Sequence, residues 1–144
     1  MRVLIFLLAA LAACSPAAEK QAPPAEVQST APGVAVAFMA PSGNVGCIYI
    51  PAGGTAVYQT SDGGAELSCD RVAPSYVRIT LPERGVAQLI ENVGDPSCCS
   101  GQALADGDAW EDGPFECQIS EEEIVCRSRD GHGFILNREQ ADVR

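Results

Sequence analysis

Seven cysteines constrain the fold of this 144-residue chain more than any other feature. Six of them lie between residues 47 and 126, and the seventh, Cys14, stands apart near the start of the chain. An even set of cysteines can pair completely in an oxidising compartment, whereas an odd one needs its own explanation. The sequence therefore predicts a small domain held together by disulfides, with Cys14 serving a separate purpose.

The residues before Cys14 are typical of an export signal. Arg2 gives a positive start, an apolar run too short to span a bilayer follows, and Leu-Ala-Ala precedes Cys14. Leu-Ala-Ala-Cys resembles a lipobox, the motif of bacterial lipoproteins. That resemblance implies cleavage after residue 13 and lipid on both the sulfur and the new amine of Cys14. An ordinary secretory signal is the alternative, but it leaves the placement of Cys14 unexplained.

The segment that follows Cys14 has little capacity to fold. Residues 14–33 hold four prolines among small and polar residues and almost no large apolar side chain. About nineteen residues at polyproline spacing reach up to roughly 60 Å, enough to hold a domain clear of lipid headgroups. We expect a signal peptide at 1–13, a lipidated cysteine with a tether at 14–33, and one domain at 34–144.

Short apolar runs between glycines and prolines predict an all-β domain. The runs are rich in Val, Ile, Tyr and Phe, and none shows a sustained helical stripe. The expected strands cover residues 34–39, 45–50, 55–60, 66–72, 76–81, 86–91, 115–120, 123–127 and 133–136. Glycine-rich turns predict that the second, third and fourth of these form a meander. The expected fold class is a small, disulfide-stapled antiparallel sheet or sandwich.

One disulfide can be assigned from the alternation of residues. The strand expected at 115–120 returns through a short turn into the strand expected at 123–127. That turn places Cys117 opposite Cys126, within disulfide reach across the ladder. We predict a Cys117–Cys126 bond that contributes on the order of 3 kcal/mol in the chain-entropy model.

The other four cysteines are expected to pair among themselves. A bond between Cys47 and Cys69 would leave the neighbours Cys98 and Cys99 to join each other or to stay reduced. We expect instead that Cys98 and Cys99 point in different directions and that each pairs with one of Cys47 and Cys69. Which takes which cannot be read from the sequence.

Four motifs are distinctive when taken together: Pro-Ser-Gly-Asn-Val-Gly-Cys from residue 41, Gly-Pro-Phe-Glu-Cys from 113, Val-Cys from 125 and Asp-Gly-His-Gly-Phe from 130. Over residues 38–138 they resemble an uncharacterised domain of secreted and lipid-anchored bacterial proteins. In that family a strand with Pro-Ser-Gly-Asn opens the domain, and a cysteine hairpin followed by Gly-His-Gly-Phe closes it. The adjacent cysteines at 98 and 99 depart from the family's spacing. The resemblance implies a fold and a compartment, and no activity comes with it.

The negative charge of the chain limits the classes of partner that it can bind. The formal net charge is −10, and removal of Arg2 with the signal leaves 8 basic against 19 acidic residues, or −11. Nucleic-acid phosphates would be repelled by such a surface. A basic envelope or extracellular protein is the protein partner that charge favours.

His132 is the single histidine, so any histidine-based mechanism depends on it, with Asp130 as the acidic neighbour. The surrounding Asp-Gly-His-Gly also suits a tight turn, because glycine relaxes backbone sterics. We favour the turn. No serine or threonine lies in a nucleophile-elbow pattern, and no thiol is expected to be free.

Four carboxylates gather in the sequence near a glycine turn and make a weak calcium candidate: Asp106, Asp108, Glu111 and Asp112. The spacing fails the EF-hand pattern, because Trp110 stands where the third acidic ligand belongs. We therefore expect a solvated acidic loop, no bound metal and no cofactor, and we place Trp110 at the core or its margin. Residues 121–123, all glutamates, are expected to form an exposed hairpin tip.

These features lead to two functional hypotheses. The first is a non-enzymatic interaction or binding module displayed on a membrane of the cell envelope. The alternative is a small envelope hydrolase that uses His132 with an acidic partner. Ser15, which follows Cys14 in place of aspartate, resembles the sorting signal for the outer membrane in two-membrane bacteria, where the domain would face the periplasm.

Overall fold

The computed structural model describes residues 33–144. The predicted signal peptide, Cys14 and residues 14–32 of the predicted tether lie outside the described residues. The described part consists of β-strands joined by turns and loops, so the all-β prediction is confirmed. Between residues 33 and 144 no helix is long and apolar enough to cross a bilayer.

The first half of the domain builds a six-stranded sheet in the order β5-β4-β3-β2-β1-β6. Its strands are β1 (Val36–Met39), β2 (Val45–Ile50), β3 (Glu66–Arg71), β4 (Val77–Pro82), β5 (Gln88–Ile90) and β6 (Gln102–Ala103). Neighbouring strands are antiparallel, except that β6 runs parallel to β1. β5 and β6 follow each other in the chain and lie at opposite edges of the sheet.

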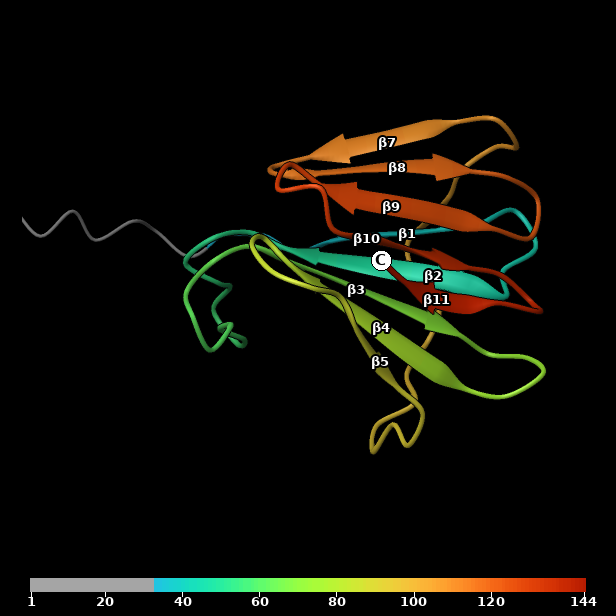
Figure 1. Ribbon diagram of the computed structural model, residues 1–144, viewed down its shortest axis with the longest axis horizontal. Helices are drawn as coiled ribbons and strands as arrows, with labels where there is room; N and C mark the ends of the chain where they lie inside the picture. The colour runs from blue at the N-terminus through green and yellow to red at the C-terminus, as the bar shows by residue number, and fades with distance from the viewer. Residues whose placement is uncertain (1–32) are drawn as a thin grey trace, which may run out of the picture.

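The second half builds a five-stranded antiparallel sheet in the order β11-β10-β9-β8-β7. Its strands are β7 (Ala109–Asp112), β8 (Phe115–Ile119), β9 (Ile124–Ser128), β10 (Gly133–Leu136) and β11 (Ala141–Val143). In Figure 1, β7, β8 and β9 lie above the strands of the first sheet, and β10 and β11 overlap those strands in the view.

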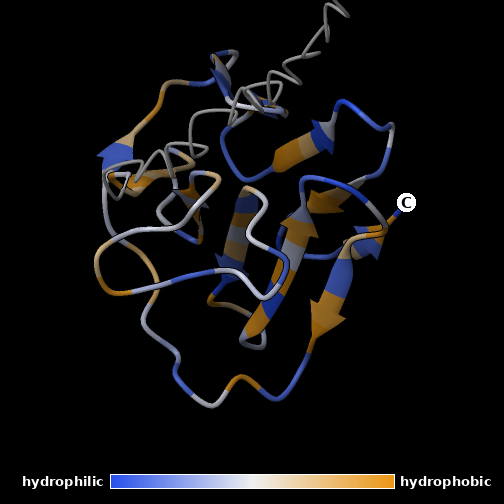
Figure 2. Cartoon of the chain, turned by 90° about the vertical axis from the view of Figure 1, so that its left-hand side faces the viewer, coloured by the Kyte–Doolittle hydropathy of each residue, from blue (hydrophilic) through white to orange (hydrophobic). Residues whose placement is uncertain are grey.

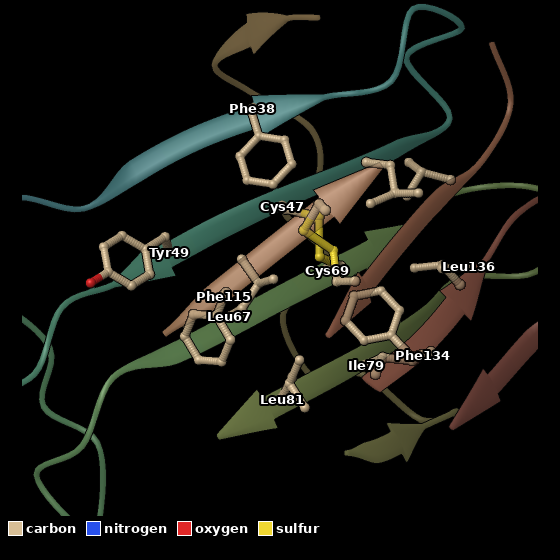
Figure 3. Packing of buried hydrophobic residues seen from close by; sticks show 14 of the residues in the cluster. Phe38, Cys47, Tyr49, Leu67, Cys69, Ile79, Leu81, Phe115, Phe134 and Leu136 are labelled. Atoms are coloured by element: carbon tan, nitrogen blue, oxygen red, sulfur yellow. A yellow bond between two sulfur atoms is a disulfide. The ribbon is translucent and has the colours of Figure 1, made fainter. Parts of the chain in front are cut away.

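The two layers pack through the alternate residues that each strand turns inward. Buried and partly buried residues alternate along β4, and buried and exposed residues alternate along β8. Figure 2 shows hydrophobic residues in orange and hydrophilic residues in blue along the strands. In Figure 3, Phe38 and Leu67 of the first sheet lie near Phe115 and Phe134 of the second. The result is a β-sandwich with one hydrophobic core.

Trp110 lies at the margin of this core, as predicted. Its ring stacks on Phe38 with 4.4 Å between the ring centroids, and it meets Tyr49 edge-on at 5.7 Å. Aromatic pairs of both geometries are favourable. The tryptophan thus belongs to the packing between the sheets.

Most of the expected strands are present, with bounds that differ by no more than two residues. The strand expected at 55–60 is wrong, and so is the meander built on it, because β2 pairs directly with β3. The hydroxyl of Thr55 accepts hydrogen bonds from the amides of Val57 and Tyr58, at 3.3 and 3.1 Å. This local turn takes the place of a ladder. The short strands β6, β7 and β11 were not anticipated.

Two disulfides lie inside the sandwich. Cys117 and Cys126 are paired across β8 and β9, as predicted. Cys47 and Cys69 are paired across β2 and β3, because the register of these strands places them directly opposite with a Cα–Cα distance of 4.0 Å. Both bonds join buried side chains of the core.

The third disulfide joins the neighbours Cys98 and Cys99. The four cysteines do pair among themselves, but the prediction that each neighbour reaches Cys47 or Cys69 is wrong. Cys47 and Cys69 point into the core, whereas the loop with the adjacent cysteines lies on the other side of the sheet, against Gly46.

Candidate functional site

The outer face of the six-stranded sheet, away from the core, carries a loop that crosses it. Residues 91–101 connect β5 at one edge to β6 at the opposite edge. In Figure 1 this loop hangs below β5 and then rises behind the strands. We call residues 91–101 the crossing loop. It covers part of a sheet face that would otherwise face solvent.

A buried ion pair attaches the crossing loop to the sheet. Asp70 of β3 is 5% exposed and receives two hydrogen bonds from Arg78 of β4, at 2.6 Å from Nε and 2.7 Å from Nη2. The Tyr76 hydroxyl also donates to Asp70 and accepts the amide of Cys98 at 2.9 Å. Arg78 Nη2 reaches the carbonyl of Asp95 at 3.3 Å. Sheet and loop therefore share one polar network.

Nε and Nη2 of Arg78 are held in this network. The hydrogen bonds that Arg78 donates to the Asp70 carboxylate raise the pKa of Arg78 above its usual value, against the opposing effect of burial. Such a bidentate guanidinium–carboxylate pair is among the stronger and more directional interactions in proteins. Arg78 and Asp70 thus neutralise each other beneath the crossing loop.

Gly46 explains how the disulfide of the crossing loop approaches the sheet so closely. A Cβ at Gly46 would lie 2.7 Å from Cys99 Cβ and 2.8 Å from Cys99 Sγ. A glycine inside a strand often marks such a close approach. The Cys98–Cys99 bond therefore rests directly on the backbone of β2.

Between the crossing loop and the sheet lies a hollow, which we call the outer pocket, with a volume of about 360 Å³. Its position is set by β2, β3 and β4, whose outward residues form the floor. Lining residues include Ile48, Ile50, Tyr58, Glu66, Cys98 and Cys99. The walls therefore combine apolar side chains and disulfide sulfur with the Arg78–Asp70 pair, two further carboxylates and one phenol. Apolar walls with a few polar groups are typical of a small-ligand site.

Glu66 is a half-buried carboxylate in the wall of the outer pocket. Its carboxylate accepts a hydrogen bond from the Tyr58 hydroxyl at 3.2 Å. Burial raises the pKa of Glu66 above its ordinary value, and Asp62 adds to the increase, while the Tyr58 hydrogen bond and the charge of Arg78 oppose it. A half-buried carboxylate of this kind is stabilised by a donor or a cation.

His132 and Asp130 lie elsewhere, in the turn between β9 and β10. Asp130 accepts hydrogen bonds from the hydroxyl of Ser128 and from the amides of Gly85 and His132, the last two at 2.6 and 3.1 Å. These bonds hold the pKa of Asp130 well below its usual range, with Ser128 contributing most. Asp130 thus links this turn to the β4–β5 turn of the other sheet.

The imidazole of His132 has no hydrogen-bond partner for Nδ1, although that atom lies 3.0 Å from Asp130 Oδ2. Two hollows beside this turn are lined by Gly131 and neighbouring residues, and neither His132 nor Asp130 lines them. The structure therefore brings the two residues together, as the sequence predicts, and places them in a connecting turn. This is the arrangement that the turn interpretation predicts.

The four carboxylates of the calcium candidate are dispersed by the fold. Asp108 accepts the amide of Ala105 at 2.8 Å, and Asp106 accepts the amide of Glu121 at 3.0 Å. Glu111 and Asp112 are consecutive residues of β7 and so point to opposite sides of the strand. Among residues 33–144, no three His, Cys, Asp or Glu side chains are placed to hold a metal ion.

The outer pocket was missed by the sequence analysis. Two signals for it were present: Gly46 interrupts a strand of otherwise large residues, and Arg78 lies on the outward face of its strand. Neither one shows that residues 91–101 cross that face. No family model, no curated protein and no solved structure matches this chain, so the assignment of a site depends on its geometry alone.

Proposed function

We propose that the domain is a non-enzymatic binding module and that the outer pocket is its ligand site. The observation that carries this proposal is the crossing loop, which is held on the sheet by a buried ion pair and by the contact of its disulfide with Gly46. Together they keep open a hollow of about 360 Å³, within the size range of small-molecule sites.

The Cys98–Cys99 bond supports this proposal because it does little for overall stability. In the chain-entropy model a disulfide stabilises in proportion to the loop it closes, and this one joins residues separated by 1. The effect of the bond is local: it gives the crossing loop a compact, apolar surface that faces the pocket. A shaped wall is useful to a protein that binds a ligand there.

A fragment screen by two-dimensional NMR tests the proposal. We expect fragments to shift the amides of Ile48, Ser68 and Cys98 in residues 33–144 of the wild type, and Gly46→Ala to abolish those shifts by displacing the disulfide. Gly94→Ala is the matched control, because a Cβ at Gly94 meets nothing within 4 Å and the residue belongs to the same loop. Fragments that shift only other surfaces, or none at all, would refute the proposal.

We also propose that the module is displayed on an envelope membrane through lipidated Cys14. The support is the lipobox-like Leu-Ala-Ala-Cys and the even number of cysteines that remains when Cys14 is set aside. In bacterial cells, radioactive palmitate should label the full-length protein and should not label Cys14→Ser. Equal labelling, or an intact mass that matches cleavage at another residue, would count against lipidation.

A further inference from the structure

The outer pocket has a chemistry that selects among ligands. We propose that it binds a primary ammonium group at the end of an alkyl chain, the group that a lysine side chain presents. This inference rests on the proposed function, since it names the ligand class of the same pocket.

Glu66 provides the partner for the ammonium group. Its only hydrogen-bond donor among residues 33–144 is Tyr58, and no lysine, arginine or histidine in that range lies within 4.0 Å of its carboxylate. An ammonium group would supply both the positive charge and the donors that a half-buried carboxylate lacks.

The positive charge of Arg78 is paired with Asp70 and so does little to attract an anion. Its Nε and Nη2 both bind Asp70, and Nη2 also binds a backbone carbonyl. The remaining carboxylates that line the pocket, Glu66 and Asp95, leave it negative. A phosphate or carboxylate ligand would meet repulsion there, and the acidic domain as a whole attracts cations.

Part of the pocket lining beside Glu66 is apolar. Ile48 and Ile50 project outward from β2, and the sulfur atoms of Cys98 and Cys99 face them from the crossing loop. Long amines bury their methylene stems along apolar surface and keep the charged head at a polar site. The Tyr58 ring beside Glu66 adds a face that a cation can approach.

The test compares two probes that differ in the ammonium group: Nα-acetyl-lysine methylamide and Nα-acetyl-norleucine methylamide. Both are titrated into residues 33–144 at pH 7 and low salt, with amide shifts at the outer pocket as the readout. We expect the lysine probe to bind at least about tenfold more tightly, the scale of one charged hydrogen bond. Glu66→Gln should remove this preference.

Glu122→Gln is the matched control, because it removes the same charge from the exposed tip of the β8–β9 hairpin. It should leave the preference intact, which separates a local carboxylate from the general acidity of the domain. Equal binding of the two probes, or equal effects of Glu66→Gln and Glu122→Gln, would overturn the inference.

The outcomes also separate the two proposals. If neutral fragments occupy the outer pocket and the lysine probe does not, the ammonium inference fails and the binding module stands. If nothing shifts the pocket, both fail. When the lysine probe does bind, a further titration compares n-butylamine with a lysine-containing peptide: tighter binding of the peptide identifies a basic protein as the source, and equal binding identifies a small amine.

Discussion

The two disulfides in the core and the disulfide in the crossing loop differ in which parts of the molecule they join. Cys47–Cys69 and Cys117–Cys126 join residues separated by 22 and 9 positions and bridge neighbouring strands inside the sandwich. Cys98–Cys99 joins direct neighbours on the outer face. In the chain-entropy model each of the first two contributes about 3 kcal/mol, and the third contributes much less. Cysteines in one small domain can thus stabilise the fold in one place and shape a surface in another.

The largest expected effect comes from removal of a core disulfide. Cys47→Ala with Cys69→Ala should lower Tm by roughly 10 to 20 °C, because it loses about 3 kcal/mol of loop constraint together with buried sulfur contacts. Thermal unfolding by circular dichroism measures the change. Cys98→Ala with Cys99→Ala is the counterpart and should shift Tm by only a few degrees. Equal losses in the two double variants would contradict the division between core and loop.

The ion pair beneath the crossing loop should give the next largest effect. Arg78→Met leaves Asp70 buried without its cation, and we expect a loss of roughly 2 kcal/mol in the free energy of unfolding, below the full cost for a wholly buried pair because Arg78 keeps 25% of its side chain exposed. Urea unfolding measures this loss. Arg127→Met is the comparison, since the Arg127–Glu116 pair is 72% and 49% exposed and should contribute close to nothing. A similar loss in both variants would show that burial of the pair is unimportant.

Gly46→Ala acts on the outer face of the sheet and leaves the core disulfides intact. The new Cβ must displace the Cys98–Cys99 wall, so we expect fragment binding to weaken at least about tenfold. The loss of stability should be smaller than that caused by removal of the Cys47–Cys69 bond or by Arg78→Met. Gly94→Ala should change neither property. The prediction fails if binding survives in Gly46→Ala while the fold is intact.

The smallest change in stability is expected from Glu66→Gln, and this substitution should stabilise the fold. The folded state raises the pKa of Glu66, mainly through burial, so the ionised carboxylate costs stability at any pH above its ordinary pKa. We expect the wild type to lose stability as pH rises from the ordinary pKa of a glutamate to the raised one, and Glu66→Gln to lack that step. The two Tm values should coincide at low pH and differ by up to a few degrees at pH 7. A lower Tm for Glu66→Gln at pH 7 would contradict this account.

Contacts between residues close together in the chain could be predicted from the sequence, and contacts between distant residues could not. The Cys117–Cys126 bond followed from period-two alternation across one short turn, where register leaves little freedom. The Cys47–Cys69 bond depended on the register of β2 against β3 across a long loop, part of which was expected to be a strand. From the sequence, this bond is disfavoured because it leaves the neighbours Cys98 and Cys99 to join each other, which is the pairing that the structure shows.

The outer pocket lay further beyond the reach of sequence patterns. It exists because β5 and β6 lie at opposite edges of one sheet, which is a consequence of topology that no local pattern specifies. Burial of Asp70, a residue that composition would place at the surface, likewise depends on the loop that covers it. The turn around Asp130 was predicted because short Gly-rich sequences encode their own geometry.

β7 has a consequence for how these molecules behave when they are crowded. It is an edge strand of the five-stranded sheet, and it ends in the consecutive carboxylates of Glu111 and Asp112. Exposed edge strands tend to pair with the edge strands of other molecules and so begin aggregation. Charged side chains on the edge strand discourage this pairing. When two copies meet edge to edge, each presents the same negative charges to the other. The acidic segment thus helps to keep neighbouring copies separate at high local concentration.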